Sequence, residues 1–93
     1  MVIGCCKIKI RAEWVNSLKD KRMELRRIVD RTKNKFNISI AEVGSNDNHR
    51  VIELGFACVT NDSAVADSII DNVLNHIERI TDGEILETET EIL

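Results

Sequence analysis

Residues 2–11 read VIGCCKIKIR, and this stretch decides the fold. The even-numbered residues from Val2 to Ile10 are apolar or small, whereas Lys7, Lys9 and Arg11 occupy the alternate positions. A period of two is typical of a β-strand that has one buried face. The stretch therefore predicts a strand with one side on a core and a mostly polar opposite side.

Two segments with helical spacing lie farther along the chain. The first begins at Ser17, which resembles a capping box with Asp20 and is followed by a basic segment that ends near Phe36. The second follows a choice of caps at residues 61–63 and has an apolar face from Ala66 to Ile80, and Gly83 fits the left-handed glycine that commonly ends a helix. The buried stripe expected for the first helix is Leu18, Leu25, Ile28, Val29 and Thr32.

Three further segments alternate like strands: residues 37–44, 50–60 and 84–93. Residues 45–48 are of types that tolerate a turn. On the last strand, Leu86, Thr88, Thr90 and Ile92 share one side. The order βαββαβ predicts a single α+β domain over residues 1–93. It is a ferredoxin-like sandwich, with four antiparallel strands in the order 4-1-3-2 and two helices on one face.

The composition is that of a small globular protein. The chain has 93 residues, of which 43% are hydrophobic and 31% are charged. A chain of this size builds one core and has little room for a deep cleft. No signal peptide or membrane span is visible, so we expect a soluble, cytoplasmic protein without a membrane partner.

The residues that could carry chemistry are few and scattered. The cysteines are Cys5, Cys6 and Cys58, and the histidines are His49 and His76. Their spacing matches no zinc site, so we expect free thiols, surface or rim histidines, no metal and no other cofactor. No nucleophile–base motif or glycine-rich phosphate loop is present, and we expect that the protein is not an enzyme.

Charge is distributed unevenly along the chain. Residues 1–41 hold eleven Lys or Arg against four acids, whereas residues 42–93 hold two against twelve. The first helix alone carries a surplus of five positive charges, which favours a site for phosphates or for an acidic partner. The alternative is neutralisation by Asp67, Asp71 and Glu78 on the second helix. The candidate contact residues are Lys19, Lys21, Arg22, Arg26, Arg27, Arg31 and Lys33.

The sheet face away from the helices is a second candidate surface. The predicted pairing sets Lys7, Lys9 and Arg11 against Glu87, Glu89 and Glu91, which neutralises that basic row. An apolar cluster is expected at one end of the same face and favours a homodimer. Its members are Ile3, Cys5, Val43, Val51 and Leu93.

Trp14 stands in the loop before the first helix. An apolar residue in this place often packs on the first helical turn, although Trp14 could also contact a partner. Together with Asn16 it is the candidate contact for a small ligand.

Several stretches resemble a known family. Residues 16–22 read NSLKDKR and resemble the opening hSLKEKR of the YlxP-like family, small bacterial proteins without an assigned function. Residues 33–43 (KNKFNISIAEV), residues 58–62 (CVTND) and Ile77-Glu78 match the same pattern, so the resemblance covers essentially the whole chain. The main departure is Asp20, where the family has Glu.

The resemblance implies a ferredoxin-like fold and no catalytic residue. Members of the family are typically encoded near translation initiation factor two and ribosome-binding factor A, which implies a role in ribosome assembly or translation.

Three hypotheses follow. The first is a binding protein that uses the basic helix on ribosomal RNA or on a ribosome-bound protein, without specificity for DNA. The second is a homodimeric adaptor that uses the open sheet face. The third is a small-ligand sensor at the Trp14 and Asn16 loop.

Overall fold

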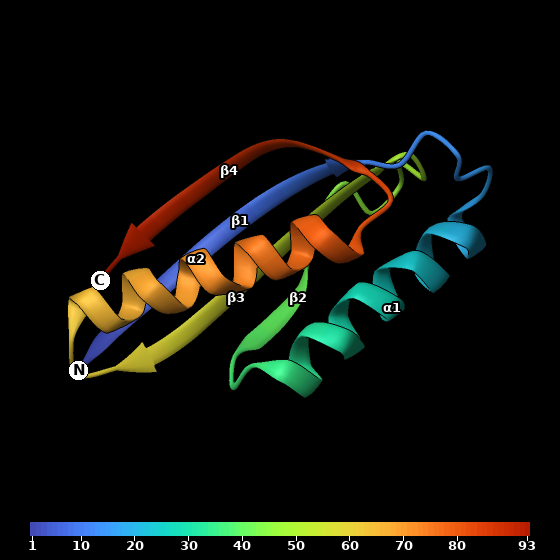
Figure 1. The fold of residues 1–93 in the computed structure, drawn as a ribbon. Helices are drawn as coiled ribbons and strands as arrows, with labels where there is room; N and C mark the ends of the chain where they lie inside the picture. Colours follow the sequence, from blue (N-terminus) through green and yellow to red (C-terminus); the bar gives the residue numbers. More distant parts are fainter.

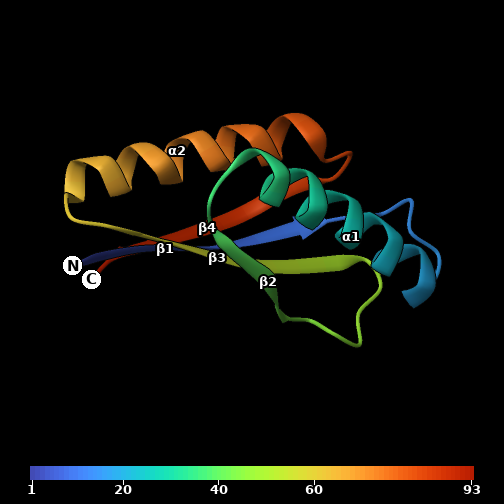
Figure 2. The same ribbon diagram turned by 90° about the horizontal axis from the view of Figure 1, so that it is seen from below.

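The computed structural model describes all of residues 1–93. All four strands form one antiparallel sheet in the order β2-β3-β1-β4, and both helices cover the same face of it (Figures 1 and 2). The predicted ferredoxin-like sandwich and its strand order are therefore confirmed. The elements are β1 (Val2–Arg11), α1 (Leu18–Lys35), β2 (Ser39–Gly44), β3 (Val51–Thr60), α2 (Ser63–Ile80) and β4 (Glu84–Ile92).

The central strand β1 supplies the middle of the core. Its inward residues Cys6, Ile8 and Ile10 are buried, and the two isoleucines have no exposed surface. They lie beside the inward residues of β3, because Ile8 pairs with Leu54 and Ile10 with Ile52. Full burial of an isoleucine side chain contributes about 1.5–3 kcal/mol, so this row is a major part of the folding energy.

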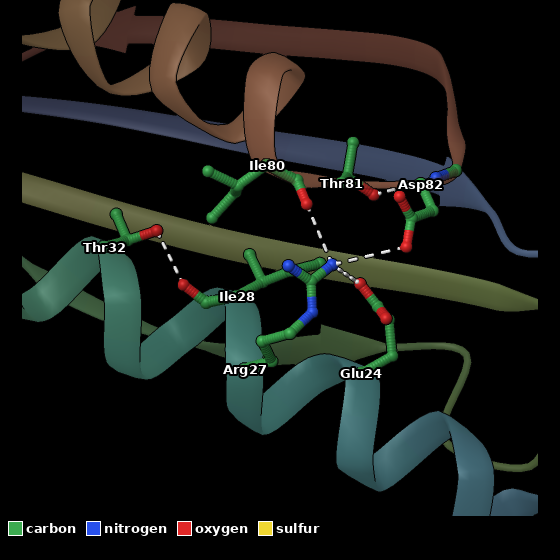
Figure 3. Close-up of polar contacts among 8 residues, drawn as sticks. Glu24, Arg27, Ile28, Thr32, Ile80, Thr81 and Asp82 are labelled. Atoms are coloured by element: carbon green, nitrogen blue, oxygen red, sulfur yellow. Dashed lines mark hydrogen bonds and ion pairs between the residues drawn. The ribbon is translucent and has the colours of Figure 1, made fainter.

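Helix α1 is anchored by a narrower stripe than predicted. The Ser17 hydroxyl caps it by accepting a hydrogen bond from the Asp20 amide at 3.1 Å. Ile28 and Thr32 are fully buried, but Leu18 is exposed, so the prediction for Leu18 is wrong. Thr32 can be buried because its hydroxyl donates to the carbonyl oxygen of Ile28 at 2.7 Å (Figure 3). Neither helix is long and apolar enough to cross a membrane.

Strand β4 contains an irregularity that the sequence pattern did not show. Lys9 pairs with Glu87, but the next residue, Ile10, pairs with Ile85, so Leu86 is an extra residue on β4. Such a bulge shifts the alternation of side chains by one. Ile85 therefore packs against the core while Leu86 is exposed, which corrects the predicted inward position of Leu86.

Gly83 serves a different purpose from the predicted left-handed helix end. Helix α2 is capped by Thr81, whose amide donates to the carbonyl oxygen of Ile77 at 2.9 Å, and no glycine in the chain has a positive φ. A Cβ atom on Gly83 would lie 2.5 Å from Cγ2 of Ile10 and 2.6 Å from the carbonyl oxygen of Arg11. Gly83 is required because β1 approaches its backbone closely.

We expect Gly83→Ala to lower the free energy of unfolding by about 1–3 kcal/mol, because the added methyl group must displace backbone and core atoms. Gly44→Ala is the matched control, since the nearest atom there is the carboxylate end of the flexible Glu53 side chain. Urea denaturation of both variants measures the difference. Equal stability of the two variants would contradict the steric role of Gly83.

Candidate nucleic-acid interface

The charged residues of α1 lie on two flanks beside its buried stripe. Arg22 lines a small hollow with Glu42 of β2 and Asn46, so its flank faces the β2 edge of the sheet. Arg27 contacts the end of α2, so its flank faces α2. Helical spacing assigns the remaining residues. The outer flank is Lys19, Arg22, Arg26 and Lys33, and the inner flank is Glu24, Arg27, Arg31 and Lys35.

The four cations of the outer flank are free. All four residues are exposed. None of the protein's five ion pairs includes any of them. The outer flank is thus a line of four cations without a formed ion pair, and the acid beside it is Asp30, one helical turn from Arg26 and from Lys33.

The acids of α2 do not neutralise α1. Asp71 and Glu78 line an open hollow with Ile85 and Thr88 of β4, and Asp67 lies one helical turn before Asp71 on the same flank. These carboxylates therefore face β4, on the side of α2 away from α1. No ion pair joins the two helices, which contradicts neutralisation of the first helix by the second.

Lys21 was predicted to contact phosphates, and this prediction is wrong. Its side chain is buried, with only 2% of the residue exposed. The Nζ atom lies 3.0 Å from Oε2 of Glu42 and donates to the carbonyl oxygens of Ser45, at 2.5 Å, and Asn48, at 2.9 Å. Ser45 has a φ of 55°, in the left-handed region that is uncommon for a serine. Lys21 therefore holds the β2–β3 turn and is not available to a ligand.

Arg27 links the two helices (Figure 3). Its Nη2 atom donates to the carbonyl oxygen of Ile80 at 2.8 Å and to the Glu24 carboxylate, and lies 3.9 Å from Oδ2 of Asp82. These contacts join α1 to the end of α2 and satisfy the guanidinium charge. Of the seven predicted contact residues, Arg27 is thus held within the fold, whereas helical spacing puts Arg31 on the inner flank, one turn beyond Arg27.

His76 is buried, against the prediction of a surface or rim position. Only 7% of the residue is exposed, and its Nε2 atom has no hydrogen-bond partner. Its ring meets the Phe36 ring edge-on, with 5.4 Å between the centroids. Burial lowers the pKa of His76 from its ordinary value, and the nearby cations Lys35, Arg79 and Arg31 lower it further. His76 is therefore neutral near pH 7.

The open face of the sheet is hollowed and partly apolar. An open hollow of about 720 Å³ crosses the strands and is lined by Cys5, Ala41 and Ala57 among others. Val43 lies over Gly55, where an added Cβ atom would be 2.9 Å from Cγ1 of Val43. This part of the face carries small or apolar side chains that no other element covers.

The predicted apolar cluster on this face is only partly correct. Ile3 and Leu93 exchange two backbone hydrogen bonds, of 3.0 and 2.8 Å, and Ile3 pairs with the exposed Val59. Val51 instead pairs with Arg11, about 26 Å farther along β3 at ~3.3 Å per residue. Val51 therefore does not belong to the cluster. Val43, which lies over Gly55, is also four residues along β3 from Val59, about 13 Å at ~3.3 Å per residue, so the cluster reduces to Ile3, Cys5 and Leu93.

Most of the predicted pairing between the cations of β1 and the glutamates of β4 on the open face is correct. Lys7 lies opposite Glu89 and Lys9 opposite Glu87, as expected. Arg11 lies opposite Glu84, and Glu91 lies opposite Cys5. The ion pairs themselves are made elsewhere: Lys7 with Glu53 at 3.9 Å and Arg11 with Glu13 at 3.6 Å.

The remaining candidate groups are dispersed. Cys6 and Cys58 are buried, Cys5 is half-buried, and all three are free thiols. Burial raises the pKa of the Cys6 thiol, which disfavours the reactive thiolate. No group of three or more His, Cys, Asp or Glu side chains is placed to hold a metal ion.

Trp14 lies against α1 rather than over an enclosed site. It lines an open hollow of about 340 Å³ with Met23 and Glu24 of α1, and Asn16 is not part of that lining. The structure therefore does not bring Trp14 and Asn16 together in one hollow.

Comparisons with known proteins agree on family and fold. The family model described as "Protein of unknown function (DUF503)" matches residues 3–90. The "Uncharacterized protein YlxP" of Bacillus subtilis (strain 168) is 37% identical over 75 residues, which cover 81% of this chain and 82% of that protein.

Two solved structures of designed proteins share the fold. The de novo designed protein LFR1 1 with ferredoxin fold aligns with a TM-score of 0.58 over 100% of this chain and 84% of its own, at 16% identity. The de novo designed protein Foldit4 aligns with a TM-score of 0.51 over 97% and 94%, at 17% identity. At these identities the likeness is one of fold alone.

We expect Lys21→Met to lower the free energy of unfolding by about 2–3 kcal/mol, because it leaves the Glu42 carboxylate and two carbonyl oxygens without their donor. Adding Glu42→Gln to Lys21→Met should recover part of this loss, since no unpaired charge then remains. Arg22→Met on the exposed outer flank is the control and should change stability by about 0.5 kcal/mol or less. A Lys21→Met variant as stable as the control would show that the Lys21 contacts contribute nothing.

Proposed function

The chain belongs to the family described as protein of unknown function (DUF503), as its resemblance to the YlxP-like proteins predicted, and on that premise we propose that it is a non-enzymatic binding protein for ribosomal RNA. The contact surface in this proposal is the outer flank of α1. Since the relatives have no assigned function, the proposal is argued from this chain's own surface.

The observation that carries the proposal is the line of free cations on the outer flank. From Lys19 to Lys33 it extends about 21 Å at ~1.5 Å per residue. Lysine and arginine side chains in such a line neutralise successive phosphates and release counterions. Contacts of this kind position a protein on nucleic acid without reading its bases.

The aromatic residues support backbone contact rather than base stacking. Single-stranded RNA is commonly stacked on aromatic rings that are exposed on a sheet face. Here Phe56 is buried in the core and Phe36 packs against it, while Trp14 lies in the loop before α1. Binding through α1 should therefore tolerate any base sequence and should not distinguish DNA by sequence.

We expect the protein to co-sediment with purified ribosomal subunits at low salt and to dissociate as salt is raised. Arg22→Gln with Arg26→Gln should weaken this binding, because two phosphate contacts are removed. For a single-stranded RNA the salt slope should then fall by about 1.4, at ~0.7 per phosphate contact. Lys9→Gln with Arg11→Gln removes the same charge from the opposite face of the molecule and should leave binding unchanged.

Two outcomes would contradict the proposal. One is the absence of binding to either subunit at low salt. The other is equal weakening by the two double variants, which would attribute the effect to net charge rather than to the outer flank.

A second candidate function, a homodimeric adaptor, is supported by the hollowed open face. Val59 is 67% exposed, and with Ile3, Cys5 and Leu93 it forms an apolar area beside the hollow. A two-fold axis parallel to β3 would lay β2 of one copy over β1 of the other and leave the acidic β4 at the rim. This arrangement lays Val59 against its own copy and keeps the glutamates of β4 apart. Glu53 of β3 also comes near its own copy, and its charge is offset by Lys7, whose Nζ atom lies 3.9 Å away.

Val59→Asp should dissociate this dimer into monomers, because it places a charge in the apolar area. Met23→Asp is the control, because it adds the same charge at a 65% exposed apolar residue of α1, on the opposite face of the molecule, and it should leave the dimer intact. Sedimentation velocity measures the mass of each variant and of the wild type. A wild type that is monomeric at high concentration would rule out this second function.

A further inference from the structure

The strip of surface along which α1 and α2 face each other, called the groove below, carries cations from both helices. Arg31 and Lys35 lie on the inner flank of α1, one turn and two turns beyond Arg27. On α2, His76 lies on the flank that meets α1, because its ring contacts Phe36 at the end of α1, and Arg79 lies close enough to His76 to act on its charge. The acids of α2 are on its opposite flank, toward β4.

The cations of this groove have no counter-ions. Arg31, Lys35 and Arg79 are exposed, and none of them takes part in an ion pair. The acids at this end of the groove, Glu24 and Asp82, are already bound to Arg27 (Figure 3). Along α1, Arg31 and Lys35 are about 6 Å apart, so they form a track rather than a single point.

His76 lies buried between these cations with an unsatisfied ring nitrogen. Almost all buried polar groups have a hydrogen-bond partner, so the bare Nε2 atom requires an explanation. The Phe36 ring contacts the imidazole, and Nζ of Lys35 lies 5.7 Å from the centre of that same ring. Beneath the helices, the inward residues of β3 are apolar, and the inward acid of β2, Glu42, is bound to Lys21. No acid therefore faces His76.

We propose that this groove binds a chain of phosphate groups, with Arg31 and Lys35 holding it from α1 and Arg79 from α2, and that His76 takes up a proton when the chain binds. The site is separate from the outer flank and does not depend on the proposed binding of ribosomal RNA there. Its ligand chemistry is shared by a free phosphoanion and by a nucleic-acid backbone.

The proton uptake follows from the charges that surround His76. In the free protein, burial and three cations disfavour the imidazolium. A bound phosphate chain offsets the cations, so the pKa of His76 rises. Since coupling between two bound species is reciprocal, the phosphate chain must bind more tightly as the pH falls.

The test is a pH titration of the histidine ring protons by NMR, with and without inorganic pyrophosphate, between about pH 8 and about pH 5. We expect pyrophosphate to raise the pKa of His76. Arg79→Ala should raise the pKa of His76 in the free protein, because a repelling cation is lost. It should also weaken pyrophosphate binding about fivefold, which corresponds to ~1 kcal/mol.

Arg22→Ala on the outer flank is the matched control and should leave the pyrophosphate response of His76 intact. An unchanged His76 pKa on adding pyrophosphate overturns the proposal. An equal response of His76 in the Arg79→Ala variant also overturns it, because that result shows only diffuse binding of an anion.

A second arm uses a short single-stranded RNA in place of pyrophosphate. A rise in the pKa of His76 with RNA identifies a nucleic-acid backbone as the ligand, whereas a rise with pyrophosphate alone identifies a free phosphoanion. Loss of RNA binding in the Arg22 and Arg26 double variant concerns the outer flank only. The pyrophosphate response of His76 therefore succeeds or fails independently of the proposed function.

Discussion

The positions of the surface cations depend on the buried stripe of α1, which contains few apolar residues. Its buried stripe includes two polar residues, Lys21 and Thr32. A buried ammonium group costs several kcal/mol unless it is paired and hydrogen-bonded, so α1 can dock only where β2 supplies Glu42 and the following turn supplies two carbonyl oxygens. These polar contacts fix the rotation of the helix. The other cations are then left on its two flanks, one beside β2 and one beside α2.

Helix α2 shows the opposite arrangement. It buries a wider apolar face and places its acids toward β4, whose own glutamates lie on the open face of the sheet. The charge asymmetry along the chain thus becomes an asymmetry in space, with cations around α1 and carboxylates around β4. A field of this shape orients the molecule as it approaches a polyanion, with α1 leading.

The fold could be predicted from the sequence. The exposure of individual site residues, such as Lys21 and Arg27, could not. Strand and helix periods, together with the rules for crossover connections, were sufficient for element order and sheet order. Lys21 was misjudged because its partners come from another strand and turn, and a lysine within a basic helix looks exposed. Leu86 was misplaced because the sequence does not mark the extra residue at which the side-chain alternation of β4 shifts by one. His76 carried a usable signal, since it lies three residues after Val73 and four before Ile80 on a buried face.

The position of β1 has a consequence for how the chain folds during synthesis. β1 is the first strand to be made, yet it lies between β3 and β4, and Cys5 meets Glu91 across 86 residues of sequence. At about 5–20 residues per second, several seconds pass before β4 emerges to complete the pairing of β1. Until β4 has been made, the inward isoleucines of β1, Ile8 and Ile10, are not fully buried. Sheets built from such distant pairings fold slowly. During these seconds the newly made chain exposes apolar side chains of an incomplete sheet. A chaperone that recognises exposed apolar surface would bind the protein at this stage rather than after folding.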